Sequence, residues 1–246
     1  MIRFLLIVLF LAIFFICSLL IYPVLLVAGL ISMDRRHKMS YAVVSWAFRF
    51  ILFIAGTKIT VIGRNRIPRD KAVLYVGNHR GFFDIVINYA VLPPVMGFVA
   101  KKEMKKIPFL SWWMMLVNCL FLDRKNIKEG LKTIIAGANN LKNGISMFIY
   151  PEGTRTRGDE PMLEFKEGSM KMAEKAGSLI IPVAMNNSSA CFEDQFPRIK
   201  KAHVVVEYGE PIDMTKMSKE EVKHIGSYTR DVIQEMLDKN AELVLK

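Results

Sequence analysis

Cysteine is scarce in this chain of 246 residues. Its three cysteines are far apart in the sequence, and one of them lies in an apolar run (Cys17, Cys119 and Cys191). This distribution excludes a disulfide framework and a cysteine metal motif, and it is typical of a reducing cytoplasm. The sequence also has no Gly-x-Ser-x-Gly element, which argues against catalysis through a covalent acyl-serine intermediate.

Charge is absent from the N-terminal run between Phe4 and Met33. A helix of this length would be about 45 Å long, whereas the hydrocarbon core of a bilayer is about 30 Å thick. Secretory signal peptides have an apolar core of only about 7 to 15 residues, so the run is too long for that class. We expect Pro23 to break or kink the helix after Tyr22.

A second apolar stretch, Met39 to Gly56, follows the mainly basic cluster 34–38. It carries a narrow polar stripe, because Tyr41, Ser45 and Arg49 recur at four-residue intervals. If both apolar segments crossed the bilayer, the basic cluster would lie on the far side, against the positive-inside tendency, and Arg49 would cost about 3 kcal/mol at mid-bilayer. A hairpin that dips into one leaflet instead lets Arg49 and the cluster reach the cytoplasmic headgroups. We favour this hairpin, on the cytoplasmic face of the cell membrane.

Length and net charge define the rest of the chain. We predict an N-terminal two-helix membrane-binding motif over residues 1–56 and one domain over 57–246, which is long enough for one core but not for two. Lys and Arg total 34 against 23 Asp and Glu, a net charge of +11. Beside a membrane segment, this charge predicts membrane lipids, an anionic bilayer surface and phosphorylated molecules as partners. Nucleic acid is not expected, since aromatic residues cluster in apolar runs such as 109–113.

Short apolar runs alternate with helical patterns beyond residue 56. Strands are predicted at 58–61, 72–76, 145–149, 179–183 and 204–208, and helices at 127–142 and 169–176. This alternation predicts an α/β domain with a central, mostly parallel or mixed sheet flanked by helices. Ser218 and Glu221 have capping-box spacing and should begin an amphipathic tail helix that packs on the domain.

The segment Asn78 to Asp84 places a histidine and a carboxylate at the end of a predicted strand. His79 lies in the expected loop, and Asp84 lies near the start of a helix predicted from Ile85 to Leu92. Residues five apart do not share a helical face, so a turn at Gly81 is needed to bring the two side chains together. A neutral imidazole suits proton abstraction near pH 7, and a carboxylate on its far nitrogen would hold the tautomer and stabilise the imidazolium.

A second polar loop, Tyr150 to Arg155, follows the predicted strand 145–149. Two further blocks are 120–124, where apolar residues run into charge, and 179–184. In this order and spacing the four blocks resemble the glycerophospholipid acyltransferase family, and most of all its 1-acylglycerol-3-phosphate acyltransferases. The resemblance covers about residues 58–208 and implies that the domain is catalytic.

The resemblance assigns roles by position. His79 and Asp84 match the His-x-x-x-x-Asp pair of the family, and Tyr150 to Arg155 matches its Phe-Pro-Glu-Gly-Thr-Arg block with Tyr in place of Phe. The phosphate of the substrate would be bound by residues of the second and third blocks and by a lysine between the first two: Lys101, Arg124, Glu152, Gly153, Thr154 and Arg155. Arginine suits this task because its planar fork binds phosphate bidentately. We expect Glu152 either to hold Arg155 or to accept a bond from a substrate hydroxyl. Taken alone, Arg124 and Lys101 could also be solvated surface charges.

The implied reaction moves an acyl group from acyl-CoA or acyl carrier protein to the sn-2 hydroxyl of 1-acylglycerol 3-phosphate (lysophosphatidic acid), giving phosphatidic acid without a cofactor. Arg80 and Gly81 depart from the small polar residue and the serine that are usual in these enzymes. An arginine after the base also occurs in glycerol-3-phosphate acyltransferases, so glycerol 3-phosphate or another lysophospholipid stays open as the acceptor. A basic membrane-anchored lipid-binding protein without turnover would need the arginines but not His79.

Overall fold

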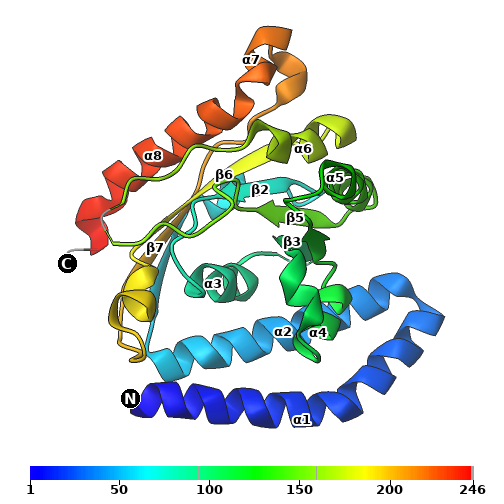
Figure 1. Ribbon diagram of the computed structural model, residues 1–246, viewed down its shortest axis with the longest axis vertical. Coiled ribbons are helices and arrows are strands. Elements are labelled where there is room, and N and C mark those ends of the chain that lie inside the picture. The colour runs from blue at the N-terminus through cyan, green and yellow to red at the C-terminus, as the bar shows by residue number, and fades with distance from the viewer. Residues whose placement is uncertain (94, 159, 245–246) are drawn as a thin grey trace.

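The computed structural model describes residues 1–93, 95–158 and 160–244, and in them one seven-stranded sheet lies between two layers of helices (Figure 1). The strands are β1 Lys58–Ile62, β2 Leu74–Gly77, β3 Met96–Lys101, β4 Leu120–Leu122, β5 Ser146–Ile149, β6 Ile180–Asn186 and β7 His203–Tyr208. Their order is β1-β7-β6-β2-β5-β3-β4, and the neighbours are parallel except for the antiparallel pair β6 and β7. The predicted mixed α/β sheet is confirmed. The five predicted strands are present, and β3 and β4 extend the sheet beyond them.

Each face of the sheet has its own hydrophobic core. The helices are α1 Ile2–Ile31, α2 Met33–Ala55, α3 Phe83–Val91, α4 Leu110–Leu116, α5 Ile127–Lys142, α6 Lys171–Ala176, α7 Lys219–Lys223 and α8 Ile225–Val244. The first four lie below the sheet in Figure 1, and α5, α6 and α8 lie above it. The capping box of Ser218 and Glu221 is present, but it begins the short α7, and the long tail helix α8 starts after His224.

The parallel strands bring five loops to one edge of the sheet. Strands β2, β3, β4, β5 and β6 share one direction. The loops that follow them therefore leave from the same edge, which is where ligand sites form in open α/β sheets. Both polar loops singled out in the sequence, after β2 and after β5, lie at this edge on adjacent strands.

The N-terminal helices agree with expectation only in part. Helix α1 continues through Pro23 without a break, although it bends in its C-terminal part (Figure 1). Ser32 alone separates the two helices, and its side chain caps α2 by accepting the N–H of Arg35. The basic cluster 34–38 thus forms the first turns of α2 and not a separate connection between the two helices.

Two residues of the polar stripe of α2 bind the domain. The hydroxyl of Tyr41 donates to the carbonyl of Leu92 (3.0 Å), and Nε of Arg49 donates to the carbonyl of Ala90 (3.0 Å). Both carbonyls lie at the C-terminal end of α3, where helix carbonyls lack intrahelical partners. Arg49 therefore docks α2 on the domain, and its contact with lipid headgroups remains a prediction.

Helix α1 exposes a long apolar surface. Leu5, Leu9, Ile16, Leu20 and Leu30 are each more than half exposed. Large continuous apolar surfaces of this kind are typical of membrane contact, and the two apolar N-terminal helices indicate membrane association. Trp113 of α4 is buried and donates to Oγ of Ser18 in α1 (2.8 Å), so α4 joins α1 to the domain.

Candidate active site

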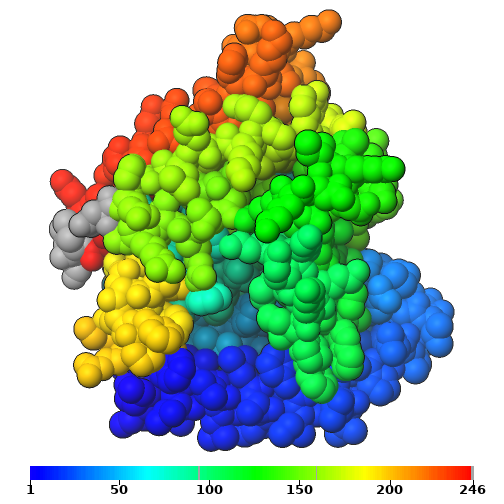
Figure 2. All heavy atoms as spheres, viewed as in Figure 1, coloured from blue at the N-terminus to red at the C-terminus, as the bar shows by residue number. Residues whose placement is uncertain are grey.

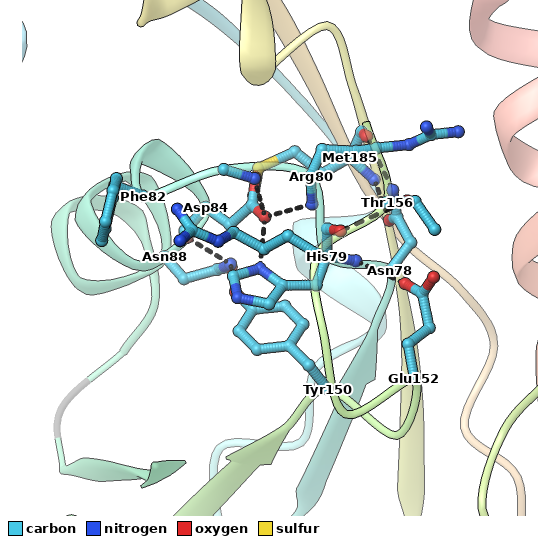
Figure 3. Close-up of polar contacts among 12 residues, drawn as sticks. Asn78, His79, Arg80, Phe82, Asp84, Asn88, Tyr150, Glu152, Thr156 and Met185 are labelled. Carbon is cyan, nitrogen blue, oxygen red and sulfur yellow. Dashed lines mark hydrogen bonds and ion pairs between the residues drawn. The ribbon is translucent and has the colours of Figure 1, made fainter. Parts of the chain in front are cut away.

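Asn78 fixes the start of the first polar loop. Its side-chain amide donates to the carbonyl of Met185 (3.0 Å) and accepts the N–H of the same residue (2.9 Å). These two hydrogen bonds continue the pairing of β2 with β6 through the Asn78 side chain. They hold the start of the loop at the sheet edge. The next residue is His79, whose position therefore depends on both strands (Figure 3).

One carboxylate oxygen of Asp84 accepts three hydrogen bonds from the first polar loop. Oδ2 accepts hydrogen bonds from Nδ1 of His79 (2.7 Å) and from the backbone N–H groups of Arg80 (2.7 Å) and Gly81 (2.9 Å). The Asp84 side chain is fully buried at the start of α3, while that of His79 is 18% exposed. Because the carboxylate occupies Nδ1, the Nε2 atom of His79 is the ring nitrogen left for a substrate. The predicted turn at Gly81 thus brings the two side chains together.

Two residues of the second loop support His79 from β5. The Tyr150 ring stacks on the imidazole with centroids 4.2 Å apart and planes within 11°. Glu152 accepts the backbone N–H of His79 with Oε1 (2.7 Å) and that of Leu163 with Oε2 (3.0 Å). Burial raises the pKa of the Glu152 carboxyl, and these two N–H donors act in the opposite direction. Glu152 is buried between the loops and holds the His79 backbone in place, and its contact with the substrate remains a prediction.

Arg155 lies beside the same loop but is held by a different carboxylate from the one expected. Its Nη1 is 3.3 Å from Oε1 of Glu193, and its guanidinium carbon lies 4.0 Å above the ring of Phe82. Within the described ranges, the carboxylate paired with Arg155 belongs to Glu193. The prediction that Glu152 holds Arg155 is therefore wrong.

Arg124 contacts the second polar loop from a different strand, at the end of the sheet order. It follows β4, and its Nη1 donates to the carbonyl of Gly153. A Cβ on Gly153 would meet Nζ of Lys166 at 3.1 Å and Cζ of Arg124 at 3.8 Å, so two cations flank this glycine. Gly153 also has a positive φ of 78°, which favours glycine. Thr154 is exposed, as is Lys101 at the end of β3, and their phosphate contacts remain predictions.

The arrangement provides an imidazole with a buried carboxylate behind it and cations around it. It matches a catalytic dyad that removes a proton from a substrate hydroxyl, with the substrate itself as the nucleophile.

Known proteins share this sequence pattern. The sequence model of the Acyltransferase family matches residues 58–186. A 1-acyl-sn-glycerol-3-phosphate acyltransferase of Borreliella burgdorferi is 30% identical over 202 residues, which cover 82% of this chain and 80% of that protein. The chain belongs to the acyltransferase family. The 1-acyl-sn-glycerol-3-phosphate acyltransferase of Saccharomyces cerevisiae is 28% identical over 211 residues, which cover 85% of this chain and 68% of that protein.

The fold of this acyltransferase also has a solved counterpart. The crystal structure of a 1-acyl-sn-glycerophosphate (LPA) acyltransferase from Thermotoga maritima superposes with a TM-score of 0.77 at 23% identity. The match covers 97% of this chain and 96% of that one, so it includes the two N-terminal helices.

Sequence reasoning missed two charged residues of the acyltransferase site. Glu193 and Lys166 lie outside the four blocks. Glu193 does follow β6, which is parallel to β2 and directly beside it. An acidic residue in the loop after a strand next to the histidine strand was a usable signal. Lys166 offers no such signal, because it lies in an irregular segment between β5 and α6.

Proposed function

We propose that this acyltransferase moves an acyl group from a thioester to the sn-2 hydroxyl of 1-acylglycerol 3-phosphate and so forms phosphatidic acid. The observation that carries the proposal is the His79–Asp84 pair, with Nδ1 bound to the buried carboxylate at 2.7 Å and the ring partly open to solvent. The relatives from Borreliella burgdorferi and Saccharomyces cerevisiae are named for this reaction, which supports the proposal. The donor would be acyl-CoA or acyl carrier protein, used as a co-substrate without a cofactor.

The proposed chemistry needs one proton carrier. Nε2 of His79 takes the proton of the sn-2 hydroxyl while the hydroxyl oxygen attacks the thioester carbonyl. The tetrahedral intermediate then expels the thiolate as the C–S bond breaks, and the imidazolium gives its proton to that sulfur. Asp84 stabilises the imidazolium between the two steps. The assay that tests the reaction offers acyl-CoA with lysophosphatidate, glycerol 3-phosphate or lysophosphatidylcholine. A product with glycerol 3-phosphate alone would reassign the acceptor, and no product with any of them would contradict the enzyme assignment.

The acceptor phosphate would lie against Arg155 and the cations near Gly153. Arg155 is supported by its place beside the His79 loop, and Arg124 and Lys166 by their approach to Gly153. Lys101 would add charge from the end of β3.

Replacing Arg155 by alanine should raise the KM for lysophosphatidate about ten- to a hundredfold. Hydrogen bonds to charged groups contribute about 1.5–3 kcal/mol, and about 1.4 kcal/mol corresponds to a tenfold change in an equilibrium constant. Initial rates at varied lysophosphatidate measure the effect, and Arg157→Ala, two residues along, is the control for a general loss of positive charge. An unchanged KM would remove Arg155 from the phosphate site.

The membrane would lie against α1, with the hairpin in the cytoplasmic leaflet. The face shown in Figure 2 is hollowed directly beside α1, and the cyan chain near residue 80 lies in this hollow. A lipid acceptor could therefore enter from the bilayer without crossing water, and the apolar surface of α1 supports this placement.

A cysteine at Lys38 tests the topology. Lys38 is 63% exposed in the first turns of α2, and Cys17→Ser would remove the native cysteine that is exposed. If the hairpin lies in the cytoplasmic leaflet, a membrane-impermeant maleimide should label the Lys38→Cys protein in inside-out vesicles and not in right-side-out vesicles. Lys216→Cys, on the domain and 80% exposed, is the matched reference. Labelling of the two cysteines from opposite sides would mean that the hairpin model of the anchor is wrong.

A further inference from the structure

Glu193 contacts both the loop of the base and the arginine proposed for phosphate binding. It begins the short helical turn η5 Glu193–Gln195, in the segment after β6. Its Oε1 accepts the backbone N–H of Phe82 at 2.6 Å and lies 3.3 Å from Nη1 of Arg155. One carboxylate oxygen thus joins three segments that are far apart in the sequence.

The carboxylate also packs tightly against the backbone of the loop. A Cβ on Gly81 would lie 2.5 Å from Oε2 of Glu193, closer than carbon and oxygen atoms approach. Gly81 leaves room for the carboxylate, and the same residue donates its N–H to Asp84 (2.9 Å). Glu193 and Asp84 therefore lie on the two sides of one peptide segment.

Arg155 is held from two directions and still has donors to spare. The Phe82 ring lies under the guanidinium at 4.0 Å, and Glu193 pairs with one of its terminal nitrogens. A guanidinium has five N–H donors in a rigid fork. Its side chain is 33% exposed, so the remaining donors can bind a phosphate while the ring and the carboxylate fix the plane of the fork.

We infer that Glu193 is a positioning residue that ties the Arg155 guanidinium to the His79 loop. The inference rests on the proposed function and deepens it. In the acceptor, the phosphate oxygen is bonded to C3 and the reacting hydroxyl to C2, so covalent bonds limit the distance between the two groups. By fixing Arg155 relative to His79, Glu193 matches the site to this distance. A loosely held arginine would have to be ordered when the phosphate binds, and this entropy cost would weaken binding of the acceptor.

The charge environment is consistent with this role. Burial raises the pKa of the Glu193 carboxyl, as does the charge of Asp84, while the Phe82 N–H and the charge of Arg155 lower it. A partly buried carboxylate in this position is stabilised by its cationic partner. The ion pair thus stabilises the charged Glu193 carboxylate and also holds the Arg155 guanidinium in place.

A double-mutant cycle on Glu193→Gln and Arg155→Ala tests the inference. Glutamine keeps the shape and an oxygen for the Phe82 N–H but loses the charge that faces Arg155. In the otherwise native protein, Glu193→Gln should raise the KM for lysophosphatidate about tenfold, with kcat changed less than threefold. In the Arg155→Ala background the same substitution should have no further effect, because its partner is gone. Equal losses in both backgrounds, or no loss in either, would overturn the inference.

Two further variants complete the design. Asp194→Asn changes the adjacent carboxylate, which accepts the Ser189 hydroxyl at 3.0 Å, and it should leave KM unchanged. Phe82→Leu removes the ring beneath the guanidinium and should raise KM in the same way as Glu193→Gln, again without effect in the Arg155→Ala background. It therefore provides a second test should Glu193→Gln fold poorly. If Arg155→Ala alone leaves KM unchanged, the phosphate assignment fails, and that outcome is distinct from a failure of Glu193 to couple to Arg155.

Discussion

Replacement of His79 by alanine is expected to lower kcat about a thousandfold. General base catalysis by a positioned side chain contributes roughly 10²–10⁴ in rate, and His79 is the imidazole that Asp84 and Tyr150 hold at the site. The KM for lysophosphatidate should change little, since His79 carries none of the proposed phosphate contacts. Release of free thiol from acyl-CoA in the presence of lysophosphatidate measures the effect.

A second histidine provides the matched control for this substitution. His224 lies at the exposed junction of α7 and α8, with 70% of its side chain accessible, and His224→Ala should retain native activity. If His79→Ala keeps more than a tenth of the native kcat while binding lysophosphatidate normally, the proposed base is wrong.

Replacement of Asp84 by asparagine should lower kcat about a hundredfold, less than the loss for His79→Ala. Two backbone N–H groups point at the position of Oδ2, so they should keep the amide oxygen of asparagine there and the amide NH₂ away from it. That oxygen can still accept Nδ1–H and hold the tautomer. What disappears is the negative charge that stabilises the imidazolium. Steady-state kcat measured beside that of Asp84→Ala tests the argument.

Asp84→Ala should be the more damaging change. It removes the acceptor shared by His79, Arg80 and Gly81, and each buried donor left unpaired costs about 1–3 kcal/mol. Thermal unfolding of the two variants should therefore show a lower Tm for Asp84→Ala, and its kcat should also be lower. Equal activities of the two variants would mean that tautomer control has no part in catalysis.

Local sequence was sufficient for most of the elements and for the meeting of His79 with Asp84. His79 and Asp84 are five residues apart, so one turn at Gly81 decides whether they meet. The strand predictions succeeded where runs are apolar and β-branched, as in 204–208. Strand β4 has three residues, too short for a periodic signal, and the direction of β7 depends on its pairing with β6 and β1, which local sequence does not encode.

Residues whose role depends on a distant partner were not predictable in this way. Glu193 meets Phe82 across 111 positions of the chain, and its one signal, a position after a strand, does not identify the partner. Arg49 shows the same limit in the anchor. The polar stripe that contains Arg49 was predicted correctly, but periodicity shows only that its residues lie on one face of the helix. It does not tell whether the facing partner is a lipid headgroup or a carbonyl at the end of α3.

Phe4 of α1 stacks on Phe192, with ring centroids 5.9 Å apart and planes within 12°. Phe192 is bonded directly to Glu193, so the first turn of the apolar helix touches the segment that steadies Arg155. An enzyme shortened by removal of α1 would therefore lose more than its attachment to lipid. Its affinity for a water-soluble short-chain lysophosphatidate should weaken as well, even in detergent, where anchoring no longer matters.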